Sequence, residues 1–344
     1  MTVICPKNKY SFMLPNGDNI DISHYLKQLN IGHDDIVIVS GTLIEGIGNE
    51  FSDIDIYIIT KEYKTPQNIN IESFFRVIST TKEILTPDSD KDILLIHLPV
   101  EETGVKIDIE YKVFDDIDSL EQKLNDYYNY AMSNHILFTK EMTERQMSFI
   151  HRIHNCICLH NQEGLGFIQE KLNKNKFCYF LYRSNASDYA DLLDIIGAWR
   201  KKEFERCFDL ARENVLKQML AYVCLLGNTD YKRKWILTRV EQSNVGEDIK
   251  KQFMSFYTPD RNNINEYIIN SLDFIDEIYQ LSAKFFENNS NKIFPNRKYV
   301  LDWLNERINL LSKPYEIYEV EYRKKAYELL LHFKTKDLLE GRSL

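Results

Sequence analysis

The sequence predicts an α+β protein in two parts, a β-sheet flanked by helices and then an all-α bundle. From about residue 130 onward, apolar residues recur at helical spacing and strand signals become few. A chain of 344 residues with 44% hydrophobic content can bury two such cores. We therefore place the domains at 1–130 and 131–344. The strand-like segments, which are rich in β-branched residues, are 36–39, 52–60, 93–98 and 105–114.

The first strand, Ile36–Val39, is an uninterrupted β-branched run, typical of a strand buried on both faces. Gly41 follows it and lets a ligand approach the backbone closely, because glycine has no Cβ. In the next strand, 52–60, residues two apart share a face. Asp53 and Asp55 therefore point the same way, and the isoleucines between and after them point into the core. Two adjacent carboxylates repel each other unless a cation lies between them, and Mg²⁺ prefers such oxygen ligands.

The later elements of the first domain follow from the same periodicities. Segment 71–85 places apolar residues at helical spacing and predicts a helix that packs on the sheet. Val105–Phe114 is the next strand and carries Asp108, with Glu110 on the same face. Asp115–Tyr130 opens with acidic residues, which is a helix-start signal, and leads out of the domain.

A family resemblance rests on the turn and on the acidic doublet. Gly41-Thr42, Gly46 and Ser52-Asp53-Ile54-Asp55 resemble the Gly-Ser-x-x-x-Gly…Ser-Asp-x-Asp signature of the DNA polymerase β-like nucleotidyltransferase superfamily. Thr42 stands where that family usually has Ser, and either hydroxyl can donate to a phosphate oxygen. The family has a third carboxylate on a later strand. Asp108 is the closest match to it, and Glu110 is the alternative.

The resemblance, which covers residues 36 to 111, implies a mixed sheet and a metal-dependent nucleotidyltransferase that releases pyrophosphate. Asp53, Asp55 and Asp108 would be the catalytic residues and would hold two Mg²⁺ ions. The nucleotide is expected to be ATP or another NTP, since nothing in the sequence identifies the base. The residues expected to bind the nucleotide are Ser40, Gly41, Thr42, Ser52, Lys232 and Lys234.

A second, weaker likeness lies in the helical half. Gly227–Ile236 resembles the glycine-to-Lys-Trp segment in the C-terminal helical domain of aminoglycoside nucleotidyltransferases. This likeness implies that Lys232 or Lys234 reaches the triphosphate, whereas the alternative is a helix start with solvated lysines. It also favours a small-molecule hydroxyl acceptor, such as an aminoglycoside-like compound, and a role in antibiotic resistance. Transfer to a protein side chain or an RNA end remains an alternative, as does a non-catalytic nucleotide-binding interaction protein.

Segment His151–His160 holds five potential zinc ligands. A single helix through 142–172 would put His151, His154 and Cys158 on one face, but no second cluster completes a tetrahedral set. Cysteines that pack as small apolar residues are therefore the preferred interpretation.

Charge narrows the class of partner. The chain carries a net charge of −9, with about −12 on residues 1–130 and about +3 on the rest. An acidic half suits metal ions and argues against a protein that holds a long nucleic acid, which would show a basic stripe. No apolar run approaches the ~20 residues of a membrane span, and no signal segment is evident. We expect a cytoplasmic protein with reduced cysteines and no membrane partner; the oligomeric state stays open.

Overall fold

The computed structural model describes residues 10–13, 17, 19–49, 51–62, 76–79, 94–99, 105–186, 189–258 and 263–340, with the backbone alone at 76–79 and 94–99. Contacts divide the chain into two compact units, each of two segments. The first unit comprises Met1–Lys123 and Glu144–Asn173, and the second comprises Leu124–Thr143 and Lys174–Leu344. Residues 144–173, which the sequence analysis assigned to the helical half, thus pack with the first unit.

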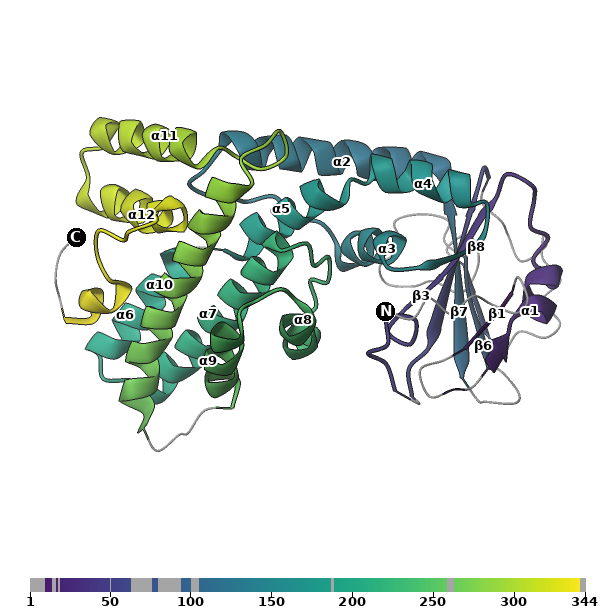
Figure 1. Cartoon of the computed structure of the whole chain (residues 1–344), viewed down its shortest axis with the longest axis horizontal. Coiled ribbons are helices and arrows are strands. Elements are labelled where there is room, and N and C mark those ends of the chain that lie inside the picture. Colours follow the sequence, from purple (N-terminus) through teal and green to yellow (C-terminus); the bar gives the residue numbers. More distant parts are fainter. Residues whose placement is uncertain are drawn as a thin grey trace. The chain divides into compact units, whose positions relative to one another are not determined.

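A mixed six-stranded sheet forms the centre of the described part of the first unit, in the order β5-β6-β7-β4-β3-β8 (Figure 1). β4 and β7 run parallel, whereas the other neighbours run antiparallel. The α+β class with a mixed sheet and flanking helices is confirmed. The strands are β3 (Ile36–Ser40), β4 (Ile54–Thr60), β5 (Arg76–Ser79), β6 (Leu94–Pro99), β7 (Lys106–Val113) and β8 (Ile157–His160).

One face of this sheet carries the apolar core of the unit. A hairpin of β1 (Ser11–Met13) and β2 (Asn19–Asp21) and the short helix α1 (Ser23–Gln28) cover it. Every second residue of the central strands points into this core, as the alternation predicts. Among the residues buried there are Phe12, Ile20, Ile22, Leu26, Val37, Val39, Ile54, Ile56, Ile58, Ile107, Ile109 and Tyr111.

The other alternating set of side chains meets α3 (Glu144–His154). Phe149 of α3 contacts the Tyr57 ring edge-on, with the two ring centroids 5.4 Å apart. α4 (Gln162–Lys171) begins at Asn161, whose side chain accepts a hydrogen bond from the Gly164 amide. A Cβ on Gly164 would lie 2.8 Å from the Ile36 side chain, so glycine lets α4 approach β3 closely.

Two of the helices predicted from the sequence differ in the structure, because part of each segment forms a strand of the sheet. Within the predicted helix 71–85, Arg76–Ser79 forms strand β5 paired with β6, and the remaining residues lie outside the described ones. The single helix expected through 142–172 is interrupted by β8, which pairs antiparallel with β3. Short β-branched runs such as Val77-Ile78 are compatible with either periodicity. In the case of β8, pairing also covers the edge of β3.

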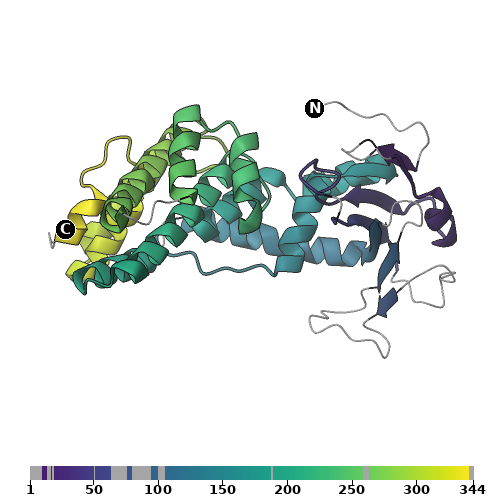
Figure 2. The same cartoon turned by 90° about the horizontal axis from the view of Figure 1, so that it is seen from below.

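The second unit is helical and includes the part of α2 (Phe114–Ser133) from Leu124 onward. α7 packs against α5, α6 and α10. The helices of this unit form a bundle (Figure 2). The aromatic residues of α5 are buried in the core of this unit. The helices are α5 (Lys174–Asn185), α6 (Tyr189–Arg200), α7 (Phe204–Leu225), α8 (Ile236–Gln242), α9 (Glu247–Tyr257), α10 (Ile264–Asn288), α11 (Arg297–Leu310) and α12 (Pro314–Lys324), with 3₁₀ turns η2 (Arg233–Trp235), η4 (Lys325–Tyr327) and η5 (Thr335–Glu340).

A buried ion pair joins α10 to the two C-terminal 3₁₀ turns. The Lys325 ammonium lies 2.7 Å from Asp276 Oδ1 and also donates to the Phe333 carbonyl and the Thr335 hydroxyl. The Thr335 amide and hydroxyl donate to the two carboxylate oxygens of Asp276. Both charges are therefore enclosed by hydrogen-bond partners, which is the condition under which buried ions are tolerated.

Across the described residues, no helix is both long enough and apolar enough to cross a bilayer.

Candidate active site

The turn after β3 brings backbone and carboxylate together. Gly41 has φ +106°, a conformation that side-chain-bearing residues rarely adopt. A Cβ at this position would lie 2.7 Å from Asp55 Oδ2, so only glycine allows this approach. The turn is closed by hydrogen bonds from the Ile47 and Gly48 amides to the Thr42 carbonyl. The sequence therefore has two independent reasons to keep glycine at position 41.

The predicted serines serve the local structure. Ser40 is fully buried at the end of β3, and its hydroxyl lies 3.4 Å from the main-chain oxygen of Asp55. The Ser52 hydroxyl accepts a hydrogen bond from the Asn49 amide and closes the turn before β4. Both hydroxyls thus fix the backbone on which the acidic doublet is placed.

Strand register sets the carboxylates beside each other. In the parallel β4–β7 pair, Asp55 lies opposite Asp108, and Tyr57 lies opposite Glu110. Asp53 directly precedes β4 and, by strand alternation, lies on the same side as Asp55. Asp55 is 9% exposed. Four acidic residues thereby lie at neighbouring positions along the β4–β7 pair.

The electrostatics of Asp55 reflect this crowding. Burial is the main cause that raises its pKa, to about 7, with Arg152 opposing the shift. The charges of Asp53, Asp108 and Glu110 each raise the pKa further. A carboxyl group that titrates near neutrality beside other acids is typical of a functional site.

Arg152 is a site residue that the sequence analysis did not predict. Its Nη2 lies 2.8 Å from Asp55 Oδ2, and its Nη1 donates to the Tyr57 hydroxyl. The guanidinium also lies over the Tyr57 ring, 5.5 Å from the centroid. Burial alone would lower the pKa of Arg152, but Tyr57 and Asp55 outweigh it and raise the pKa. Arg152 is therefore the resident counterion of Asp55. The sequence signal was its place three residues after Phe149, on the face of α3 that meets the sheet.

The remaining polar side chains on this face have partners of their own. Lys112 pairs with Glu110 at 2.5 Å, and its ammonium lies 5.7 Å from the centroid of the Phe149 ring. His151 Nε2 lies 3.1 Å from Glu45 Oε1 and so connects α3 to the turn after β3. α3 thus contacts the glycine turn and the doublet strand at once.

The structure shows no preformed metal site among the residues that it describes. Within the ranges that it describes, no three His, Cys, Asp or Glu side chains converge as a metal-binding group, the three predicted carboxylates included. Chemically the donor set suits a hard divalent cation, since it consists of carboxylates whose mutual repulsion a cation would relieve. In this arrangement, however, Arg152 occupies one oxygen of Asp55. Of the zinc candidates, His154 binds the Leu172 carbonyl and Cys158 lies in β8 rather than on the helix of His151.

Lys232 and Lys234 belong to the second unit. Lys234 lies in η2 with its ammonium 5.3 Å from the centroid of the Trp235 ring, and the Lys232 amide donates to Asp230. Asp230 in turn forms a buried ion pair with Arg239 at 2.8 Å. The Gly227–Ile236 segment is thus an ordered turn, fixed by Asp230, that carries both lysines.

Comparison with known proteins gives matches among solved structures. No model of a known protein family matches the sequence. No curated protein matches it either. Among solved structures, a nucleotidyltransferase-like protein from Exiguobacterium sibiricum matches with 10% identity and a TM-score of 0.40, over 83% of this chain and 78% of that one. A likeness of this size does not establish a shared activity, so the function has to be argued from the site.

Proposed function

We propose that the protein is a nucleotidyltransferase that moves an NMP, with ATP as the expected donor, to a hydroxyl group. The observation that carries the proposal is the β4–β7 register, which sets Asp55 beside Asp108 next to the Gly41 turn. A glycine turn beside clustered carboxylates combines a place for phosphates with ligands for cations. The register also favours Asp108 over Glu110 as the third carboxylate, since Glu110 is paired with Lys112.

In this proposal Asp53, Asp55 and Asp108 would hold two Mg²⁺ ions, which would lower the pKa of the acceptor hydroxyl and neutralise the triphosphate. The hydroxyl oxygen attacks the α-phosphorus, the bond to pyrophosphate breaks, and the hydroxyl proton passes to Asp108. Gly41 and Thr42 bind the triphosphate. The protein contributes mainly by positioning and by electrostatics, and forms no covalent intermediate.

In this proposal the site has a metal-free state, in which Arg152 pairs with Asp55, and a metal-bound state. With Asp55 Oδ2 engaged by the guanidinium, a divalent cation has to share or displace that contact. When no cation is bound, the positive charge of Arg152 lowers the energetic cost of burying these carboxylates. We therefore include Arg152 in the site, as a competitor of the metal for Asp55.

The chemical class of the acceptor is proposed from the charge of the first part of the chain, not from the shape of a pocket. Residues 1–130 carry about −12, which would attract a cationic, amine-rich molecule such as an aminoglycoside-like compound. Such an enzyme would act in the cytoplasm and would confer antibiotic resistance, and Lys232 or Lys234 would contact the triphosphate. Transfer to a protein side chain or an RNA end is the alternative acceptor class.

The experiment is pyrophosphate release from each NTP with Mg²⁺, against a panel of aminoglycosides, other hydroxylated small molecules, protein and short RNA. Asp55→Asn is the test variant. Asp118→Asn is the matched control, since Asp118 is an exposed acid of the same unit that pairs with Lys171. Acceptor-dependent release that persists in the control and disappears in Asp55→Asn supports the proposal. If no NTP releases pyrophosphate with any of these acceptors, the proposal is overturned.

A further inference from the structure

The second unit buries a positive charge that has no acidic partner. Arg183 of α5 is only 8% exposed. Its Nη1 donates to the main-chain oxygens of Ala131 and Asn134, at 3.0 and 2.9 Å. Throughout the described residues, no carboxylate forms an ion pair with it. The carbonyl end of α2 offsets part of the charge, but a buried cation normally has an anion beside it.

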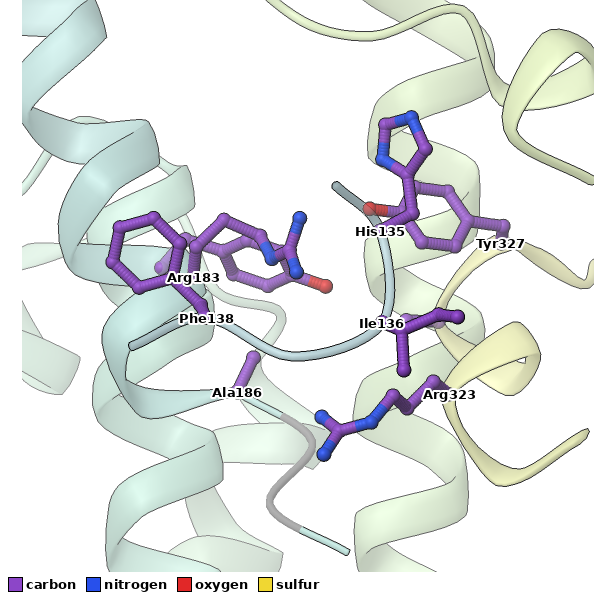
Figure 3. A pocket seen from close by; sticks show the side chains of 9 residues that line it. His135, Ile136, Phe138, Arg183, Ala186, Arg323 and Tyr327 are labelled. Atoms are coloured by element: carbon purple, nitrogen blue, oxygen red, sulfur yellow. The ribbon is translucent and has the colours of Figure 1, made fainter. Parts of the chain in front are cut away.

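A pocket opens beside this arginine. It holds about 310 Å³ of space, part of which is open to solvent. Figure 3 shows Arg183 and Ala186 on one side, Arg323 and Tyr327 on the other, and the segment with His135, Ile136 and Phe138 between them. No acidic side chain is among the described residues that line it. The polar side chains of its wall are therefore cationic, neutral imidazole or hydroxyl groups.

His135 adds an unsatisfied group to the same wall. It is 3% exposed, and its ring packs edge-on against Trp303 and Tyr327. Neither ring nitrogen has a hydrogen-bond partner. Burial and then the nearby charge of Arg183 lower the pKa of His135 to about 3, so the ring is neutral and keeps one N–H to donate. Buried polar groups without partners mark places where a water or a ligand belongs.

Arg323, on the opposite wall, is held by its own helix. Its Nη2 lies 2.8 Å from Glu319 Oε1, one turn earlier in α12. Glu319 balances the charge of Arg323 but does not reach Arg183, so the pocket keeps the positive charge of one guanidinium. Guanidinium groups match the planar oxygens of carboxylates and the oxygens of phosphates.

We infer that this pocket binds a single oxyanion, a carboxylate or phosphate group at the end of a larger metabolite whose remainder lies in solvent. Arg183 supplies the compensating charge, and Arg323 and Tyr182, which also line the pocket, supply further donors. The inference uses only the helical unit and is independent of the proposed transferase site.

The test is isothermal titration of the full chain with inorganic phosphate and, separately, with acetate, at constant ionic strength with chloride as the background anion. Arg183→Met is expected to weaken binding at least tenfold. Arg206→Met, which removes an exposed guanidinium paired with Glu203 in the same unit, is the matched control and should bind as the unaltered chain does.

Because Arg183 is buried, Arg323→Gln provides a second variant that keeps the inner guanidinium, with an expected loss of at least threefold and circular dichroism as the check on folding. Binding of phosphate alone assigns a phosphate group, and binding of acetate alone assigns a carboxylate. The inference is overturned when neither anion binds the unaltered chain, or when both pocket variants bind as tightly as the Arg206→Met control.

Discussion

Asp55 and Asp276 are both buried aspartates paired with a cation, one in each unit, and they differ in what surrounds the pair. Asp276 receives Lys325 together with the amide and hydroxyl of Thr335. Asp55 receives Arg152 and faces Asp53, Asp108 and Glu110. Burial is the main cause that raises the pKa of both carboxyl groups, but at Asp55 other acids add to it.

The two aspartates illustrate the difference between a buried charge that stabilises the fold and one that is available to bind a ligand. A buried network in which every charge is satisfied fixes a packing arrangement. A buried network with surplus charge costs stability and persists where the charge binds something. On this reasoning Asp276 holds the C-terminal turns on α10, and we propose a binding site at Asp55.

The largest effect is expected from breaking the satisfied pair. Asp276→Asn leaves the Lys325 ammonium buried without its counterion, since Lys325 is fully buried. Removing one partner of a buried pair costs about 3–5 kcal/mol. Urea titration followed by circular dichroism should show a loss of this size, whereas Asp55→Asn should cost much less because it removes repulsion along with the pair. Equal losses in the two variants would contradict the distinction.

Activity should depend on Asp108 more than on Glu110. Once an acceptor is known, Asp108→Asn is expected to lower kcat/KM by about 10²- to 10³-fold, the size typical of losing a main electrostatic stabiliser of the transition state. Glu110→Gln should retain most activity, because Glu110 is paired with Lys112 rather than placed opposite Asp55. The reverse ranking would move the third carboxylate to Glu110.

Asp55 should make the stability of the protein depend on pH. The pKa of Asp55 is about 7 in the folded state against about 3.9 in an unfolded chain. The folded state therefore binds this proton more tightly, so the stabilisation is fully present below about pH 4 and is lost as the pH rises to about 7. Urea titrations from pH 4 to 8 should show this decline, and it should be shallower in Asp55→Asn, which lacks the contribution of Asp55. Parallel curves for the two proteins would refute the assignment.

Arg152 should oppose cation binding. Arg152→Gln is expected to raise the affinity for Mn²⁺ by about tenfold at a pH where Asp55 is ionised, because it frees Asp55 Oδ2 and removes a repulsion between unit charges of about 1–4 kcal/mol at 4 Å. Arg145→Gln removes the same charge two turns earlier on α3 and controls for net charge. Electron paramagnetic resonance of free Mn²⁺ measures both variants without relying on turnover. An equal gain in the two variants would mean that Arg152 acts only through overall charge.

Features fixed by residues close together in the sequence were predicted, whereas features fixed by contacts between distant residues were not. β3, β4 and β7 were predicted because continuous or alternating β-branched runs record their burial directly. β8 was missed because four residues after a helix carry little periodicity of their own and are fixed by pairing with β3. Local spacing identified the acidic doublet and its glycine.

The pairing of Arg152 could not be predicted, because its partner Tyr57 lies 95 residues earlier and the contact depends on how α3 meets the sheet. The pocket at Arg183 was hidden for a related reason. Arg183 ends the buried aromatic run of α5, and His135 lies in a segment without periodicity. Tertiary contacts, rather than residue types, make these side chains notable.

The central claim is that Asp55 and its neighbouring carboxylates bind divalent cations together with a nucleoside triphosphate. The most direct measurement is Mn²⁺ binding by electron paramagnetic resonance in the presence and absence of ATP, for the unaltered chain and for Asp55→Asn, with Asp118→Asn as control. The account predicts ATP-dependent binding that is weakened at least a hundredfold in Asp55→Asn and unchanged in the control. Mn²⁺ binding that is the same in all three proteins would contradict it.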